Sequence, residues 1–492
     1  NRSPLNNGTN LAAVILGALT EAPSEPFLSD AERSLTRGQF LTAVAERQHQ
    51  LNKLFTTTGH NILVPGGRGI QSWVDSIAVW GIGHTVVPLG ITITDSQAQY
   101  IANISDAKAI LGHHPGLKEG GFSCMVIDEP SLSHVKMGIQ TNITADIASI
   151  VFTSGSTGNP KGAALTHKAL IGNARATRDV LNPDQSDKLF MAIPFNFISA
   201  ISHFLVMAIS GAKLFAIETR LLAADFFTAL NKSEANCFGG SPMQMRWIGD
   251  FTQNGSLPLR WLMSSGDHLP TETISQLSKQ LPNSDIFTVY GMTELAGRFC
   301  ILPPEMHDQH AGAVGRPIHG LNVLVMNDDK SPADIDEVGE VYASGEYLMQ
   351  SYFGTPDVTS MTLTDKGVRT GDLGFLDANG LLHLVGRADD EFKCNGEKVS
   401  ALPIIQALME TGLFSDVAVC GAESPVYGTV PYAFYVLKQG NVFDKKIVVP
   451  HLRRVLPSSH IPREFKPLPA IPRTGSGKVK RADLKQLALQ NL

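Results

Sequence analysis

Short apolar runs alternate with segments of helical periodicity along the first 115 residues of the chain. Runs typical of strands lie at 61–67, 84–90 and 107–112, and the segments at 70–83 and 94–105 carry apolar residues at helical spacing. Strands that alternate with helices of this length form βαβ units in a mainly parallel sheet. The same pattern continues to about residue 300. It predicts further strands at 189–195, 212–217, 259–266 and 285–291.

The pattern changes after about residue 315. Short alternating strands with glycine-bearing turns at 322–327, 339–347 and 381–390 indicate a small β-subdomain. Helical and strand-like segments mix again in the last hundred residues, and helices are expected at 445–456 and 479–489.

Charge density rises within "VGRADDEFKCNG", which makes this stretch the expected boundary between two domains. The sequence therefore predicts an α/β protein. A large N-terminal domain over 1–386 would hold parallel-rich sheets packed with helices plus the β-subdomain, and a small α+β C-terminal domain would span 387–492.

Composition narrows the class of protein. The chain has 492 residues, 43% of them hydrophobic, and a net charge of −6 without a basic stripe, so nucleic acid is not an expected partner. Its five cysteines are scattered without a CxxC pair, which favours neither a disulfide framework nor a zinc site. The apolar segment 11–20 is too short to span a bilayer and lacks a basic region before it. We expect a first helix there, no membrane span and a cytoplasmic protein.

A glycine- and hydroxyl-rich segment, "TSGSTGNPKG", follows an apolar run and occupies 153–162. A P-loop needs Gly before its lysine and Ser or Thr after it, whereas Lys161 is flanked by Pro160 and Gly162. The segment "GSGK" at 475–478 also departs from the pattern, because Val479 follows. Taken alone, either segment is typical of a surface turn.

Four further motifs follow "TSGSTGNPKG" in a fixed order: "VYGMTE" (289–294), "RTGDLG" (369–374), "GRADDEFKCNG" (386–396) and "PRTGSGKVKR" (472–481). With these five collinear motifs, from about residue 35 to 485, the chain resembles the adenylate-forming superfamily of acyl- and aryl-CoA ligases, peptide-synthetase adenylation domains and beetle luciferases. The resemblance implies that a carboxylate attacks the α-phosphate of ATP to give acyl-AMP and pyrophosphate. A thiol then displaces AMP.

The resemblance also implies which residues handle the phosphates and the metal. The phosphate loop supplies hydroxyls, amides and one cation for the β- and γ-phosphates, from Thr153, Ser154, Ser156, Thr157 and Lys161. Thr293 contacts the α-phosphate and Glu294 holds Mg²⁺. Lys478 is the catalytic lysine that bridges the carboxylate and the α-phosphate.

The nucleoside and the hinge are assigned in the same way. Tyr290 stacks on adenine and is followed by Gly291 of the same motif, while Gly266 and Asp267 pass the adenine edge. Asp372 accepts hydrogen bonds from both ribose hydroxyls, a task suited to a carboxylate, and Arg387 adds a second ribose contact. Asp389 is the hinge about which a mobile C-terminal domain turns between adenylation and thioester formation.

The segment 193–205 matches the family's acyl pocket. Phe197 lies where an aromatic residue or histidine guards the acyl tunnel. Ile198 replaces the aspartate that pairs with the α-ammonium group in amino-acid-activating members. An unpaired buried ammonium would cost several kcal/mol, so an α-amino acid is disfavoured.

Three polar residues bear on the acid's distal end. Ser199 and His203 are one helical turn apart on the same face, and Arg298 follows "YGMTE" closely. If His203 and Arg298 face the pocket, the acid carries a polar or anionic distal group. The alternatives are a hydrogen-bonded core histidine and an arginine in a surface ion pair.

The sequence thus predicts an ATP- and Mg²⁺-dependent acid–thiol ligase acting on a small-molecule carboxylic acid. Coenzyme A is the expected acceptor, and the phosphopantetheine arm of a carrier protein is the alternative. No "GGxS" carrier segment follows, so the acceptor is expected in trans. A stand-alone adenylating enzyme and a catalytically silent acyl- or nucleotide-binding relative remain as other interpretations. Retention of Lys161, Glu294, Asp372 and Lys478 together argues against the silent relative.

Overall fold

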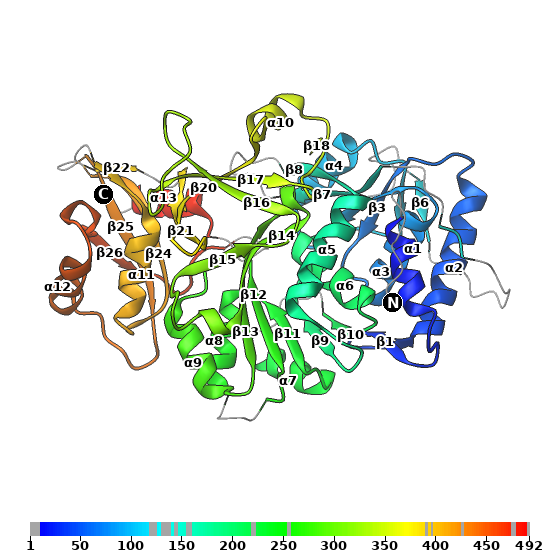
Figure 1. Cartoon of the computed structure of the whole chain (residues 1–492), viewed down its shortest axis with the longest axis horizontal. Coiled ribbons are helices and arrows are strands. Elements are labelled where there is room, and N and C mark those ends of the chain that lie inside the picture. Colours follow the sequence, from blue (N-terminus) through cyan, green and yellow to red (C-terminus); the bar gives the residue numbers. More distant parts are fainter. Residues whose placement is uncertain are drawn as a thin grey trace.

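The computed structural model describes most of the chain (Figure 1). The described residues are 10–117, 125–128, 139–141, 146–153, 160–217, 223–252, 257–388, 392–394, 397–424, 428–473 and 479–489. Of the residues predicted to form the site, Ser154, Ser156, Thr157, Asp389 and Lys478 lie outside these ranges.

The βαβ pattern predicted for the first 115 residues is confirmed. Strands β3 (Asn61–Pro65), β4 (Thr85–Leu89) and β5 (Ala109–Leu111) pair in parallel and are separated by helices α3 (Ile70–Gly81) and α4 (Asp95–Ile104). Every residue of α3 is buried, which explains its apolar run.

These strands belong to a seven-stranded sheet. Its order is β18-β8-β7-β4-β3-β5-β6, and the pairs β7–β8 and β8–β18 are antiparallel. The remaining strands of this sheet are β6 (Met125–Ile127), β7 (Ile147–Thr153), β8 (Lys161–Thr166) and β18 (Ser351–Tyr352).

A second, larger sheet contains all four strands predicted between 189 and 291. It is parallel from β1 through β10, β9, β11 and β12 to β13, and antiparallel from β13 onward and between β1 and β2. The strands of the first half are β1 (Pro26–Ser29), β2 (Ser34–Thr36), β9 (Lys188–Met191), β10 (Lys213–Ala216), β11 (Cys237–Gly240), β12 (Trp261–Ser265) and β13 (Asp285–Met292).

The strands predicted after residue 315 form, and they extend this sheet. β14 pairs with β15 and β15 with β21, so the β-subdomain continues the edge of the central sheet (Figure 1). Its strands are β14 (Gly297–Leu302), β15 (Ala313–Pro317), β16 (Leu321–Met326), β17 (Gly339–Gly345), β19 (Leu363–Thr364), β20 (Gly367–Leu376) and β21 (Leu382–Arg387).

Helices fill the space between the two sheets and cover their outer faces. α5 contacts strands of both sheets, α6 contacts strands of the larger sheet, and both pack on α1, so they form the central layer (Figure 1). The largest apolar cluster of the described residues lies there and includes Trp73, Trp80 and Phe204. The helices up to residue 362 not yet given are α1 (Leu11–Leu19), α2 (Arg37–Leu54), α5 (His167–Leu181), α6 (Ile198–Ile209), α7 (Ala223–Ser233), α8 (Pro242–Phe251), α9 (Thr271–Gln280) and α10 (Pro356–Thr362).

The residues after 391 form an apolar cluster of their own around Phe414, Phe434 and Leu452. The three-stranded sheet β24-β25-β26 and a β22–β23 hairpin pack with three helices there. The elements are β22 (Phe392–Cys394), β23 (Glu397–Val399), α11 (Ala401–Glu410), β24 (Phe414–Ser424), β25 (Gly428–Leu437), α12 (Lys445–Val455), β26 (Glu464–Pro467) and α13 (Arg481–Leu489). Both helices predicted from periodicity in this region are present.

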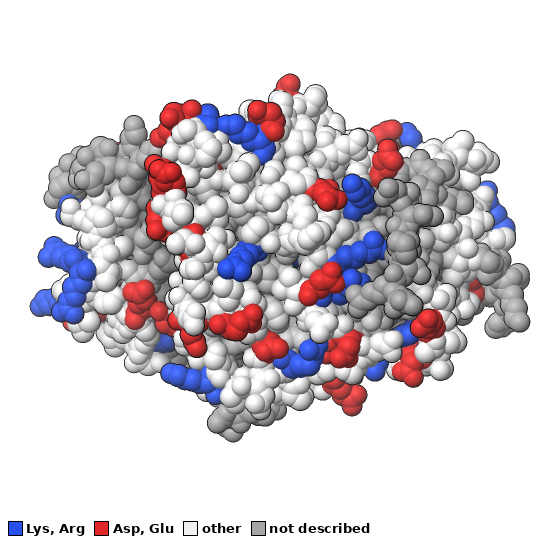
Figure 2. All heavy atoms as spheres, in the orientation of Figure 1, with Lys and Arg blue, Asp and Glu red and all other residues white. Residues whose placement is uncertain are grey.

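Acidic and basic side chains are interspersed across the face shown in Figure 2, in line with the modest net charge. Among the described helices, none combines the length and the apolar character needed to cross a bilayer.

Candidate active site

The motif strand β13 ends in a tight antiparallel turn into β14. Gly291 lies opposite Arg298 in this pair, and a Cβ at Gly291 would come within 2.0 Å of the Gly297 carbonyl oxygen. Only glycine therefore allows this approach of the two strands. The close pairing places Tyr290, Thr293 and Glu294 together at the end of β13.

Tyr290 and Asp372, expected at adenine and ribose, are in direct contact. The Tyr290 hydroxyl donates a hydrogen bond to Oδ2 of Asp372, and Nη1 of Arg387 lies 3.3 Å from Oδ1. Asp372 and Arg387 are register partners on the neighbouring strands β20 and β21. Burial, with a smaller contribution from Asp372, raises the pKa of Tyr290, so the phenol stays a donor. Three motifs distant in sequence thus meet at one carboxylate.

Glu294 is held by a residue that the sequence motifs do not include. Tyr352 donates a hydrogen bond from its hydroxyl to Oε1 of Glu294, and burial, then the Glu294 charge, raises the pKa of this phenol. The Glu294 backbone carbonyl accepts from the Met349 amide at 2.7 Å. The segment "QSYFG" around Tyr352 carries no periodicity or motif that would have identified it.

Lys161 lies over the ring of the same tyrosine. Its Nζ is 5.7 Å from the centroid of the Tyr352 ring, because β18 pairs with β8, the strand that Lys161 begins. Thr153 and Lys161 are register partners across β7 and β8 and mark the two ends of the predicted phosphate loop. Tyr352 therefore contacts both residues, Lys161 over its ring and Glu294 through its hydroxyl.

The residues present fit a nucleotide with its magnesium ion. Asp372 offers two acceptor oxygens beside Tyr290, as a ribose diol requires. The described residues contain no group of three or more His, Cys, Asp or Glu side chains able to hold a metal alone. Mg²⁺ typically binds through one or two carboxylates plus substrate phosphates, so a single Glu294 in contact with the same tyrosine as Lys161 suits it.

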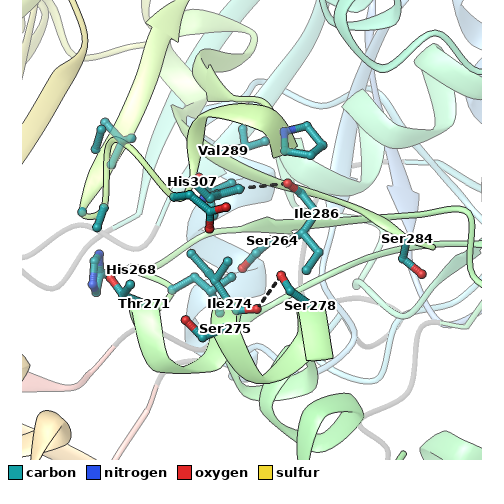
Figure 3. Close-up of a pocket in the computed structure, with 18 of the residues that line it drawn as sticks. Ser264, His268, Thr271, Ile274, Ser275, Ser278, Ser284, Ile286, Val289 and His307 are labelled. Atoms are coloured by element: carbon teal, nitrogen blue, oxygen red, sulfur yellow. Dashed lines mark hydrogen bonds between the residues drawn. The ribbon is translucent and has the colours of Figure 1, made fainter. Parts of the chain in front are cut away.

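A cavity of about 590 Å³ adjoins β13, the strand that carries Tyr290 (Figure 3). Figure 3 shows side chains of α9, of β12 and β13 and of His307 turned toward this space. Ser264 and Thr288 are register partners, and each has an enclosed hydroxyl without a hydrogen-bond partner among the described residues. Thr288 and Tyr290 share one face of β13, since side chains alternate along a strand. The cavity is lined by Ile286, Thr288 and Val289 of β13 and not by Tyr290, so it adjoins the strand that carries the motif tyrosine.

Gly266 and Asp267 follow β12 at the rim of this cavity. Gly266 has φ +100°, a conformation that glycine adopts readily, and it leaves open space where a side chain would stand. The Asp267 carboxylate faces the C-terminal residues: Oδ2 lies 3.4 Å from Nη1 of Arg473. Asp267 was expected at the adenine edge, and its position beside Arg473 was not predicted.

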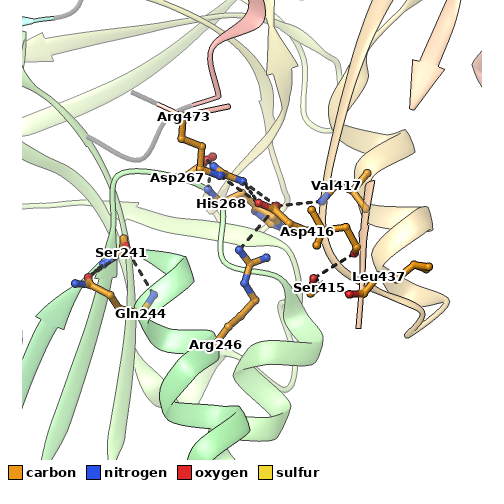
Figure 4. A network of polar contacts seen from close by, with 11 residues as sticks. Ser241, Gln244, Arg246, Asp267, His268, Ser415, Asp416, Val417, Leu437 and Arg473 are labelled. Atoms are coloured by element: carbon orange, nitrogen blue, oxygen red, sulfur yellow. Dashed lines mark hydrogen bonds and ion pairs between the residues drawn. The ribbon is translucent and has the colours of Figure 1, made fainter. Parts of the chain in front are cut away.

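Arg473 connects the two parts of the chain through a charged network (Figure 4). Its Nη2 donates to Oδ1 of Asp416 at 2.8 Å, and Nη2 of Arg246 on α8 lies 3.9 Å from the same oxygen. Asp416 thus lies between two arginines, one from each side of the interface. Arg473 is the last described residue before 474–478, and this network fixes its side chain against the N-terminal part of the chain.

The acyl-pocket residues lie at the N-terminus of α6. Phe197 is the N-cap and makes no side-chain capping bond, and Ile198 and Ser199 in the first turn are partly exposed. Nδ1 of His203 lies 2.6 Å from the Ser199 carbonyl oxygen, and Nη2 of Arg298 lies 2.8 Å from the same Nδ1. The structure brings His203 and Arg298 together.

Both of these polar residues are enclosed: His203 is 1% exposed and Arg298 is 2% exposed. Arg298 is therefore not in a surface ion pair, one of the alternatives open from sequence. Burial, and then the neighbouring arginine, lowers the pKa of His203 well below its usual value, so the ring is neutral. Burial also lowers the pKa of Arg298, to about 10, and the guanidinium keeps its charge at neutral pH.

Known proteins resemble this chain over its whole length. A curated sulfoacetate–CoA ligase of Cupriavidus necator is 26% identical over 96% of this chain and 97% of its own. A D-alanine–D-alanyl carrier protein ligase of Bacillus cereus is 25% identical over 89% of this chain and 91% of its own. The crystal structure of the anthranilate CoA ligase AuaEII with anthranoyl-AMP matches the fold with a TM-score of 0.91, at 20% identity and 99% coverage of both chains.

Two family models account for most of the sequence. The model of AMP-binding enzymes matches residues 18–353, and the model of the AMP-binding enzyme C-terminal domain matches residues 406–478. The first match alone covers more than half of the chain and includes the phosphate loop, β13 and Tyr352. The chain belongs to the AMP-binding enzyme family.

Proposed function

We propose that this chain activates a carboxylic acid with ATP to give acyl-AMP and pyrophosphate and then transfers the acyl group to coenzyme A. One observation carries the proposal: Asp372 and Glu294 are each held by a tyrosine hydroxyl at the end of β13, with Lys161 beside the second tyrosine. The carboxylates have distinct partners, as separate roles toward a ribose and a metal-bound triphosphate require.

The first half-reaction brings two anions together. A carboxylate oxygen of the acid forms a bond to the α-phosphorus, and the bond from that phosphorus to the bridging oxygen breaks as pyrophosphate leaves. Mg²⁺ on the phosphates would neutralise part of this charge. Glu294 orients the metal, Thr293 contacts the α-phosphate, and Lys161 with the loop hydroxyls binds the leaving pyrophosphate. Lys478 is assigned to bridge the attacking and attacked groups.

The adenine ring is assigned to the space beside Tyr290, where the cavity adjoins β13. Tyr290 supplies a π surface, and the unpartnered hydroxyls of Ser264 and Thr288 supply hydrogen bonds to the ring nitrogens and the amino group. Gly266 leaves room for close approach of the base. Asp372, kept in place by Tyr290 and Arg387, receives the ribose hydroxyls.

Thioester formation needs a second arrangement of the same residues. The thiol sulfur bonds to the acyl carbon, the bond from that carbon to the AMP oxygen breaks, and the thiol proton goes to solvent. We assign residues 387–492 to a domain that turns about Asp389 and withdraws Lys478. The Arg473 contact with Asp267 then holds the arrangement used for adenylation.

The relatives differ in their acceptors. The Cupriavidus necator protein is named a CoA ligase, and the Bacillus cereus protein is named a D-alanine–carrier protein ligase. Ile198 cannot pair with an α-ammonium group, which separates this chain from a D-alanine-activating site and favours the CoA acceptor.

The test is ATP–pyrophosphate exchange across a panel of aryl, short-chain, dicarboxylic and long-chain acids, with and without Mg²⁺. At least one acid is expected to support exchange. The Lys478→Ala variant is expected to lower it by about three orders of magnitude, the range for a lost transition-state contact. Lys485→Ala, at an exposed position of α13, is the matched control.

The acceptor is then measured with the active acid. Thioester formation with coenzyme A supports the proposal, and loading of a phosphopantetheinyl carrier protein in its place supports the carrier alternative. Absence of exchange with every acid, while AMP still binds, would leave a catalytically silent nucleotide-binding protein. Undiminished exchange in Lys478→Ala would contradict the role of that lysine.

A further inference from the structure

Within the acid-activating function proposed above, we propose that the substrate carries a second anionic group, a carboxylate or sulfonate, and that Arg298 binds it. The proposal names the substrate class and assigns Arg298 as the residue that selects it.

The charge of Arg298 is not balanced by protein. Within the described residues no carboxylate lies within ion-pairing distance of its guanidinium, although the side chain is 2% exposed. Arg47, which is equally enclosed, is paired with Asp75 at 2.7 Å. Because an enclosed charge without a counter-charge costs several kcal/mol, a buried arginine of this kind is expected to meet an anion from outside the chain.

The guanidinium of Arg298 also lacks hydrogen-bond acceptors. Arg37 is another enclosed arginine without a carboxylate, and it donates to the carbonyl oxygens of Glu21 and Gly211 at 2.8 and 2.7 Å. Arg298 has one carbonyl, that of Ser199, at 3.5 Å. Nε is enclosed without a partner in both arginines, and Nη1 of Arg298 forms no hydrogen bond to a described residue.

His203 does not supply the acceptors that the Arg298 guanidinium lacks. The 2.6 Å contact between Nδ1 and the Ser199 carbonyl requires a proton on Nδ1, since a carbonyl oxygen only accepts. Nη2 of Arg298, 2.8 Å from that nitrogen, then meets a second donor. Nε2 of His203 is the remaining acceptor and lies 3.4 Å away. The cluster has more donors than acceptors, a composition suited to an anion with several oxygen atoms.

The position of the cluster favours the substrate as the source of that anion. Arg298 lies directly across from Gly291, which is exposed and belongs to the motif of Thr293 and Glu294. The guanidinium reaches the first turn of α6, whose N-terminus has no side-chain cap and adds partial positive charge. The Arg298 guanidinium and the N-terminus of α6 therefore both contribute positive potential close to the motif of Thr293 and Glu294.

The geometry limits the acid to a compact one. Gly291 precedes Thr293 by two residues, and a strand rises by about 3.4 Å per residue, so Arg298 begins within roughly 7 Å of the α-phosphate contact. A short diacid or sulfonated acid fits this spacing, whereas a plain fatty chain would bring methylene groups against an unpaired cation.

The experiment compares acids of equal length with one or two anionic groups, by the kcat/KM of ATP–pyrophosphate exchange, which needs no thiol. The pairs are succinate with butyrate and glutarate with pentanoate, and 3-sulfopropanoate is the sulfonate arm. We expect the acid with two anionic groups to exceed its partner by at least about tenfold, the effect of one charged hydrogen bond. The diacid and sulfonate arms identify which anion is preferred.

The Arg298→Gln variant tests the assigned residue. It is expected to raise KM for the preferred acid by about a hundredfold and to leave kcat/KM for the matched monoanion unchanged or raised, while Arg298→Lys falls between. If Arg298 had only a general structural role, the variant would lower kcat/KM equally for both acids. Arg178→Gln, at the end of α5, is the control, and the unfolding temperature and AMP affinity are measured for each variant.

The outcomes separate the two proposals. Equal activity of the wild-type protein with both members of each pair, or a preference for the monoanion, overturns this inference and leaves acid activation standing. Because the wild-type comparison needs no variant, misfolding of Arg298→Gln does not affect it. Absence of exchange with every acid overturns the proposed function itself. Selectivity that persists in Arg298→Gln overturns the role of Arg298.

Discussion

Tyr290 on β13 donates a hydrogen bond to Asp372 on β20, which joins two motifs 82 residues apart. The phenol holds one oxygen of the carboxylate while Arg387 lies near the other. The proposed ribose acceptor is therefore fixed before the nucleotide arrives, which lowers the entropy cost of binding.

Replacing Asp372 by Asn is expected to weaken AMP binding by about 10- to 100-fold, the effect of losing hydrogen bonds to a charged acceptor. Tyr290→Phe keeps the ring and loses the donor, so a smaller loss is expected. Isothermal titration calorimetry with AMP measures both. Asp377→Asn, farther along the same polypeptide, is the control, and unchanged AMP affinity in Asp372→Asn would falsify the ribose assignment.

Tyr352→Phe is expected to raise the Mg²⁺ concentration for half-maximal pyrophosphate exchange by about 3- to 10-fold. Glu294 loses the hydrogen bond that orients its carboxylate, and such a bond is worth about 1.5–3 kcal/mol when one partner is charged. A magnesium titration at saturating ATP measures the change.

The control is Tyr342→Phe, which removes a comparable hydroxyl contact to Glu340 away from the site. The same magnesium midpoint in Tyr352→Phe and wild type would argue against a positioning role for Tyr352.

Asp416→Asn is expected to lower pyrophosphate exchange by about tenfold or more, because Arg246 and Arg473 would face each other without the carboxylate between them. Asp267→Asn is expected to lower pyrophosphate exchange by only about 2- to 5-fold, since the Asp267 side chain is 47% exposed and exposed ion pairs are weak. Exchange rates at low and high salt measure both effects.

Salt should lower the wild-type rate toward that of Asp267→Asn, because screening weakens the exposed contact. The exposed Asp365→Asn is the control. Equal rates in Asp416→Asn, Asp365→Asn and wild type would show that the network does not support adenylation.

The protein is expected to lose stability as the pH falls from about 6.5 to 4. Burial, opposed in part by Asp146, lowers the pKa of His167 from 6.5 to about 4. The unfolded chain then binds a proton in this window that the native chain does not, which favours unfolding by at most about 3 kcal/mol. Protonation would also break the hydrogen bond that Nδ1 of His167 accepts from the Leu11 amide at 3.1 Å.

His167→Asn keeps an acceptor without the titrating group, so its urea midpoint should fall less between pH 7 and pH 4.5. The exposed His49→Asn should behave as wild type. An identical pH dependence for His167→Asn and wild type would show that His167 does not cause the loss of stability. His84 would then be the remaining candidate, because burial also lowers its pKa to about 4.

Periodicity along the sequence was enough to predict the alternating strands and helices of the first sheet, because β3, β4, β5 and α3 are almost wholly buried and α4 buries residues at helical spacing. It did not show that the strands after residue 315 extend the central sheet. That continuity depends on the pairing of β14 with β15, and pairing between distant segments leaves no local pattern.

The motifs brought Tyr290, Glu294 and Asp372 to one site, but they did not reveal Tyr352. Tyr352 reaches Glu294 because a two-residue strand pairs with β8, and two residues are too few to show a pattern. The contact of Arg473 with Asp267 spans 206 positions and depends on how two separately packed parts of the chain meet. Such contacts follow from tertiary packing rather than from local sequence.

β8 is paired on both edges, with β7 through Thr153 and Lys161 and with β18 through Ala163 and Tyr352. Lys161, the proposed phosphate-binding lysine, is therefore anchored by the sheet, independently of the seven residues that separate it from Thr153. Under the proposed function, substitutions among those residues can change the rate of pyrophosphate release without moving Lys161 away from the ring of Tyr352, whose hydroxyl contacts Glu294. The rate of pyrophosphate release and the position of Lys161 can therefore vary independently between related proteins, although both depend on the β7–β8 hairpin.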